Sequence, residues 1–98
     1  MATALIPLGL PAATSDPVTL ASGESAQLFL VTDDGKMPPS EVRFEVDYQT
    51  DDVTKWMTVF TLGAFGILSV VIPGKVTFRV RRLVPPATYS RAAGINQG

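Results

Sequence analysis

The sequence contains no histidine and no cysteine. Histidine is the commonest general base and a common metal ligand, so its absence removes the usual basis for acid–base catalysis. Without cysteine, the chain has no thiol nucleophile, no cysteine ligand for zinc and no disulfide bond. The serines have no histidine to activate them. We therefore expect a protein that is not an enzyme and that binds neither a cofactor nor a metal ion.

An excess of charge of one sign is also lacking. Eight Lys and Arg residues oppose nine Asp and Glu residues, which gives a net charge of −1 over 98 residues. This balance argues against a surface built to hold nucleic acid or an anionic membrane. Hydrophobic residues make up 46% of the chain, which predicts one folded domain. No Lys or Arg precedes the first apolar segment, so we expect no signal peptide.

Alternation of apolar and polar residues is the clearest pattern present. Residues 42–49 alternate Val, Phe and Tyr with charged or amide residues, and residues 75–81 alternate Val and Phe with Lys, Thr and Arg. A period of two predicts half-buried strands in which Phe44, Phe78 and Val80 point inward. Less regular segments rich in strand formers predict four further strands, at residues 17–20, 25–32, 55–62 and 67–72.

Short strands separated by turn residues, with no helical period, predict an all-β fold. We expect an antiparallel β-sandwich of about 6–7 strands. Residues 1–14 and 84–98 hold four of the eight prolines and show no alternation, so we expect extended N- and C-terminal arms around a sandwich domain of residues 15–83. A core of that size is marginal without disulfides or metal, and we expect an assembly to hold the arms.

One long run lacks charge altogether. Residues 56–74 are uncharged, lie between Lys55 and Lys75, and are numerous enough to span a bilayer with Trp56 at one interface. Glycines, hydroxyl residues and a proline interrupt the run, and a membrane span leaves the alternating strands on either side without partners. We therefore interpret the run as strands and expect no membrane contact, with a single-pass membrane protein as an alternative.

Adjacent carboxylates occur at Asp33-Asp34-Gly35 and at Asp51-Asp52. A calcium ion takes about six to eight oxygen ligands, usually several from one loop. Neither pair is followed by the further Asp, Asn or Glu ligands of such a loop. Asp and Gly are common turn residues, so we interpret both sites as turns.

The only basic stripe comprises one lysine and three arginines: Lys75, Arg79, Arg81 and Arg82. Positions 75, 79 and 81 share the outward face of their strand if Phe78 points inward. Such a stripe can contact phosphates, but no exposed aromatic residue obviously interleaves with it. We favour a cross-strand ladder with Glu45 and Asp47, or a protein interface, and expect no nucleic acid partner.

Trp56 is the only tryptophan, and a lone large aromatic residue in a sandwich most often fills the core. The alternative is an exposed ring that stacks on carbohydrate beside Tyr48 or Tyr89. Two segments are apolar on both strand faces: residues 28–31, and Leu68 with residues 70–72. Their second faces must be covered by the arms, by another subunit or by a larger surface, because exposed apolar patches usually mark interaction sites.

A family resemblance covers about 40 residues, from Glu41 to Arg82. The strand 42–48, then Trp56, then the segment 73–81 resemble an immunoglobulin-like or fibronectin-like sandwich module. The Pro-Gly turn before a Phe-Arg-Val-Arg strand is similar to small virion proteins of tailed bacteriophages, the capsid decoration (cement) proteins and related neck or tail modules. The resemblance implies a structural role without a cofactor, on the capsid surface after synthesis in the host cytoplasm. The chain departs from the immunoglobulin pattern because it lacks the inter-sheet cysteine pair.

Our first hypothesis is therefore a non-enzymatic structural protein of a virus particle, a capsid decoration protein that clamps neighbouring coat subunits. Its expected partners are the major capsid protein or other virion proteins, and it is expected to be a homo-oligomer on the particle. The alternatives are a fibronectin-like adhesion module, a phage neck or tail module, and the membrane protein described above. The expected partner-binding residues lie in the arms and the basic stripe: Leu5, Ile6, Leu8, Leu10, Arg79, Arg81, Arg82 and Tyr89.

Overall fold

The computed structural model describes residues 3–9, 12–36, 42–49, 55–63, 67–83 and 92–98. Within these ranges the chain forms nine strands and no helix, which confirms the all-β prediction. The strands in chain order are β1 (Thr3–Gly9), β2 (Ala13–Thr14), β3 (Val18–Thr19), β4 (Ala26–Thr32), β5 (Phe44–Gln49), β6 (Trp56–Leu62), β7 (Ser69–Ile72), β8 (Thr77–Arg82) and β9 (Ala93–Gln97).

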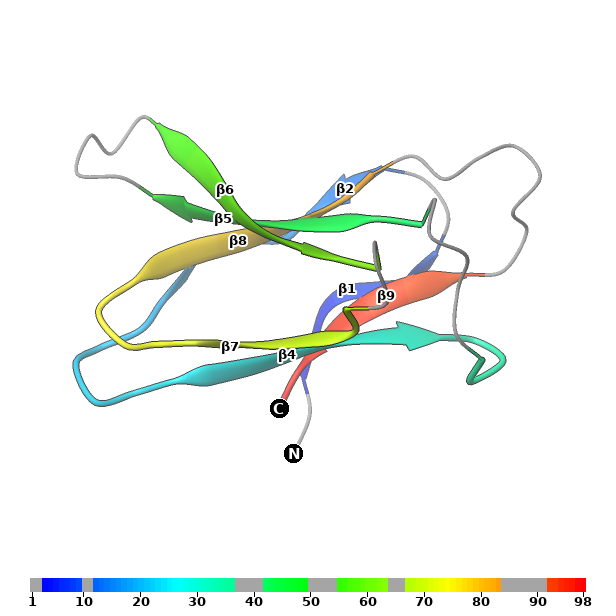
Figure 1. The fold of residues 1–98 in the computed structure, drawn as a ribbon, viewed down its shortest axis with the longest axis horizontal. Helices are drawn as coiled ribbons and strands as arrows, with labels where there is room; N and C mark the ends of the chain where they lie inside the picture. The colour runs from blue at the N-terminus through cyan, green and yellow to red at the C-terminus, as the bar shows by residue number, and fades with distance from the viewer. Residues whose placement is uncertain (1–2, 10–11, 37–41, 50–54, 64–66, 84–91) are drawn as a thin grey trace.

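Two antiparallel sheets form the molecule, as the two layers of Figure 1 show. The first sheet has the strand order β1-β9-β4-β7. The second sheet has the order β2-β8-β5-β6, and β3 also pairs with β8. Strands β7 and β8, which follow one another in the chain, belong to different sheets, so the Pro73-Gly74 turn carries the chain from one layer to the other.

The core lies between the sheets and takes its largest side chains from both. Phe44, Val46, Phe78 and Val80 from the second sheet are fully buried, and they pack with residues of the first sheet such as Leu28. The unbroken register of β5 against β8 places these apolar side chains on one face, because every second residue of a strand points the same way. The inward direction predicted for Phe44, Phe78 and Val80 is confirmed.

The two terminal segments are strands of the sandwich, and the expectation of extended arms is wrong for the part that the structure describes. Strand β1 pairs with β9, β9 also pairs with β4, and Ile6 and Ile95 are buried in the core. Register shifts on both sides of Ile6 hide the alternation. Pro7 fits because β1 is an edge strand, where a missing N–H need not remove a ladder hydrogen bond. The described parts of both terminal segments therefore belong to the sheets.

The uncharged run of residues 56–74 contains β6 and β7, one in each sheet. Its alternating neighbours β5 and β8 pair with each other, and β5 also pairs with β6. Among the described residues, no helix has the length and apolar character needed to cross a membrane. The strand interpretation of this run is confirmed.

Candidate functional site

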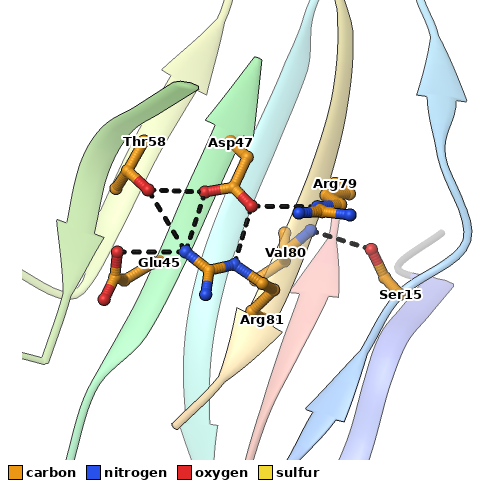
Figure 2. Close-up of polar contacts among 7 residues, drawn as sticks. All are labelled: Ser15, Glu45, Asp47, Thr58, Arg79, Val80 and Arg81. Carbon is orange, nitrogen blue, oxygen red and sulfur yellow. Dashed lines mark hydrogen bonds and ion pairs between the residues drawn. The ribbon is translucent and has the colours of Figure 1, made fainter. Parts of the chain in front are cut away.

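A polar cluster lies on the outer face of the second sheet and is centred on Asp47 of β5 (Figure 2). Arg79 and Arg81 of β8 donate from Nε to Asp47 Oδ2, at 2.9 and 2.7 Å. Thr58 of β6 donates from its hydroxyl to Asp47 Oδ1 at 2.8 Å. Arg81 Nη2 also donates to Asp47 Oδ1 at 3.1 Å and to Glu45 Oε2 at 3.2 Å. Three neighbouring strands thus share one network of charged hydrogen bonds.

Burial makes Asp47 the most constrained member of this cluster, because its side chain is only 2% exposed. Burial alone raises the pKa of the Asp47 carboxyl, but hydrogen bonds from Arg81, Arg79 and Thr58 outweigh it and lower the pKa below its ordinary value. In return, the hydrogen bond to Asp47 raises the pKa of Arg81. The ladder interpretation of Arg79 and Arg81 is confirmed, and both guanidinium groups are engaged within the molecule.

Trp56 belongs to this outer face, and the expectation that it fills the core is wrong. It is half-buried, and the guanidinium carbon of Arg79 lies 4.4 Å from its ring centroid in a cation–π contact. The reason is a β-bulge: Val46 pairs with Phe60 but Asp47 pairs with Thr58, so β6 holds one extra residue, Val59. The bulge turns Trp56 and Thr58 outward. The broken alternation at Met57 and Val59 was the sequence signal of this shift.

Arg82 is separated from the basic stripe by burial, which corrects its predicted place on a partner-binding surface. It has the same strand parity as Phe78 and Val80, so it points inward and is 7% exposed. Its Nη1 donates to the backbone carbonyls of Pro7 (2.7 Å) and Ala93 (2.9 Å), which ties β8 to both terminal strands. Burial lowers the pKa of the Arg82 guanidinium. Parity along the strand was sufficient to predict this direction.

The remaining partner-binding candidates do not form one surface. Ile6 is a core residue and Leu5 is half-buried against the core, whereas Leu8 is 50% exposed. Leu10 and Tyr89 lie outside the described residues. Of the described candidates in the N-terminal segment, Ile6 and Leu5 thus pack inside this domain and Leu8 does not.

The Asp33-Asp34-Gly35 segment is a turn, which confirms its interpretation. Asp34 Oδ1 accepts a hydrogen bond from the Lys36 amide at 3.0 Å, and Gly35 has a φ of 70°, which favours glycine. Asp33 Oδ2 accepts a hydrogen bond from the Ala92 amide at 3.4 Å, next to β9. Asp51-Asp52 lies outside the described residues. Within the described ranges, no group of three or more Asp or Glu residues is arranged to hold a metal ion.

A second candidate surface is the side of the sandwich where β6 and β7 lie. Each is the last strand of its sheet, and the two contact each other. Neither strand contains a charged residue, and we call this side the charge-free edge (β6 and β7 with Ile67). The described residues include five exposed large hydrophobic side chains. Four of them belong to this edge: Met57 (55%), Phe60 (36%), Ile67 (45%) and Val71 (59%).

The opposite side of the sandwich has features that protect a sheet edge. In the first sheet, β1 contains Pro7, whose carbonyl accepts from Arg82. In the second sheet, two short strands flank Ser15, whose hydroxyl accepts from the Val80 amide at 2.9 Å (Figure 2). Prolines and very short strands are common means of blocking edge pairing. The two sides of the molecule therefore differ in how open they are to a further strand.

Comparison with known proteins adds no relative: no protein-family model, no curated protein and no solved structure matches this chain. The geometry itself defines an all-β sandwich with one internally satisfied polar face and one apolar, charge-free edge.

Proposed function

We propose that this protein is a non-enzymatic structural protein that acts by protein–protein contact, within a virus particle. The observation that carries the proposal is the charge-free edge. Four of the five exposed large hydrophobic side chains of the described residues gather there, on two strands without charge. Native edges usually carry charges, prolines or bulges against unwanted pairing. Strand β6 has the bulge at Val59, but β7 has none of the three, so its edge favours a surface that has a partner.

The polar cluster supports a structural role for the other face. Acid–base catalysis uses a group that can gain or lose a proton near neutral pH, and nucleophilic catalysis uses a nucleophile that an adjacent base activates. Asp47 is held ionised by two arginines and is shielded from solvent. One face of the Trp56 ring is covered by Arg79, which disfavours the carbohydrate-stacking role of an adhesion module on that face.

The virion setting rests on the resemblance of the Pro73-Gly74 turn and the Phe78–Arg81 strand to small phage virion proteins. An immunoglobulin-like relationship of the two sheets and a position on the capsid surface, with the major capsid protein as a partner, are part of this proposal. The mode of contact differs from the arms expected at first. Because β1 and β9 belong to the sandwich, we assign attachment to the charge-free edge instead of to straps.

The test is to locate the protein on purified particles from the cultures that produce it. We expect quantitative mass spectrometry of gradient-purified particles to find the chain in a fixed ratio to the coat protein. Recombinant wild-type protein should rebind to particles stripped of it. The Val71→Lys variant should bind at least about tenfold more weakly, while the matched Leu8→Lys variant, changed on the opposite side, should bind like wild type. Absence of the chain from the particles overturns the virion proposal.

A further inference from the structure

The backbone of β7 presents hydrogen-bonding groups to the outside of the first sheet. The Leu30 amide donates to the Leu68 carbonyl at 2.8 Å, and Leu28 pairs with Val70 in the same antiparallel register. Because hydrogen-bonded pairs recur at every second residue, the amide and carbonyl of Val70 face β4. Those of Ser69 and Val71 therefore face away from it. Among the described strands, β4 is the only one that pairs with β7.

We propose that β7 pairs antiparallel with β7 of a second copy of this chain. The twofold axis between the copies passes between their two Val70 residues, which lie opposite each other. In this register, Ser69 of one copy lies opposite Val71 of the other, and each pair exchanges both backbone hydrogen bonds. The first sheets of the two copies then form one continuous sheet. The inference rests on the proposed function, because it uses the same charge-free edge, and it names the partner as an identical chain.

Two neighbouring residues favour this register over its alternatives. A shift that puts Val71 opposite Val71 places Ser69 opposite Pro73, which has no amide hydrogen to donate. A shift that puts Ser69 opposite Ser69 places Val71 opposite Ile67, whose carbonyl already accepts from the Gly63 amide at 2.7 Å. The register centred on Val70 pairs Ser69 with Val71 inside β7, where neither restriction applies, and its pair of Ile67 with Pro73 falls outside the strand.

The charge distribution also suits a second copy. A twofold interface places a surface against itself, so any charge on it meets a like charge nearby. Strands β6 and β7 carry none, and the next charged residue along the chain, Lys75, lies beyond the Pro73-Gly74 turn. On the outer face of the sheet, the pairing covers Val71, the most exposed large hydrophobic residue described, with Ser69 of the second copy.

The first experiment measures the oligomeric state of the intact chain by analytical ultracentrifugation over a range of concentrations. We expect a concentration-dependent dimer. Val71→Pro removes an outward amide that β4 does not use, so the fold should persist while the dimer dissociation constant rises roughly tenfold. Val71→Lys should have at least the same effect, and Leu8→Lys should dimerise like wild type. A wild-type chain that stays monomeric, or variants that dimerise equally, overturn the proposal.

The second experiment uses the absence of natural cysteine to test the register. In an antiparallel pair without mutual hydrogen bonds, the opposed Cα atoms lie about 4.5 Å apart, within the range of a disulfide. A single Val70→Cys substitution should therefore cross-link two copies under mild oxidation. The Ser69→Cys control, one residue off the axis and more exposed, should cross-link far less. Equal cross-linking of both variants, with a folded circular dichroism spectrum, overturns the register.

The outcomes separate this inference from the proposed function. A chain that dimerises through Val70 but is missing from particles supports the edge pairing and overturns the virion role. A chain that is monomeric in solution and yet binds stripped particles through Val71 supports the virion role and overturns the second copy as the partner.

Discussion

Two pairs of antiparallel strands close the core of this molecule in different ways. The β5–β8 pair in the second sheet keeps one register over its whole length and buries Phe44, Phe78 and Val80. The β1–β9 pair in the first sheet changes register twice and buries Ile6 and Ile95 just as completely. Complete burial of a large side chain therefore does not require a regular ladder.

The difference lies on the outer faces. The β5–β8 pair carries the polar cluster around Asp47, so polar residues mark every second position in the sequence. The β1–β9 pair has no such cluster among the described residues, and its segments contain Ala, Gly and Pro in place of charged residues. A polar outer face makes a strand recognisable in a sequence, and its absence conceals the strand.

The largest loss of stability is expected from the deletion of residues 1–9, which tests whether β1 is needed for the fold. If β1 is a structural strand, the deletion removes Ile6 from the core, one of the two strands that pair with β9, and an acceptor of Arg82. Loss of a buried Ile side chain alone costs about 2–5 kcal/mol. Since total stability is about 5–15 kcal/mol, we expect no cooperative thermal unfolding by circular dichroism. A truncated chain that melts close to wild type would restore the arm interpretation, and Ile6→Ala should give an intermediate loss.

Phe78→Ala tests the core contribution of the β5–β8 pair. It removes a fully buried side chain opposite Tyr48 in the β5–β8 register. We expect a loss of about 3–5 kcal/mol in the free energy of unfolding, measured by urea denaturation. Thr77→Ala, on the same strand but directed away from the core, should lose less than about 1 kcal/mol, since it gives up one exposed hydrogen bond to Thr19. Equal losses for the two variants contradict the inward direction of Phe78.

The same contrast explains how much the sequence predicted. The all-β class, the positions of β5 and β8, and the pairing of Arg79 and Arg81 with carboxylates followed from alternation. The broken alternation at Met57 and Val59 signals an irregular strand, but the position of the bulge could not be predicted from it, because an extra residue is specified by the pairing of two strands and not by one strand alone. The role of the N-terminal segment was missed for a similar reason, since β1 exists only against β9, far away in the sequence.

The substitution Asp47→Asn tests how much the polar cluster on the β5–β8 pair contributes to stability. The variant keeps the shape of the side chain but removes the charge that two arginines share. Hydrogen bonds to charged groups contribute about 1.5–3 kcal/mol, and we expect a loss of that size at pH 7. Glu45→Gln is the matched control, because Glu45 is more exposed and, among the described residues, pairs with Arg81 alone, at 3.2 Å. It should lose less than about 1 kcal/mol.

The pH dependence of this loss has a defined sign. Folding lowers the pKa of Asp47 below its ordinary value of 3.8, so its contribution is complete above that pH. The contribution disappears as the pH falls through the lower pKa of the folded state. Denaturation curves of wild type and Asp47→Asn should therefore differ at pH 7 and converge in strong acid. A difference that stays constant down to that range contradicts the pairing of Asp47 with the arginines.

The smallest expected effect concerns Trp56, the residue whose direction the bulge decides. On the outer face it contributes a cation–π contact with Arg79, which is worth about 0.5–1 kcal/mol when solvent is near. In the core, removal of so large a ring would cost about 3–5 kcal/mol. We expect Trp56→Leu to lose the smaller amount, measured by urea denaturation with circular dichroism. A double-mutant cycle with Arg79→Met should show a coupling energy of the same size. If Trp56→Leu instead loses as much stability as Phe78→Ala, Trp56 lies in the core and β6 has no bulge.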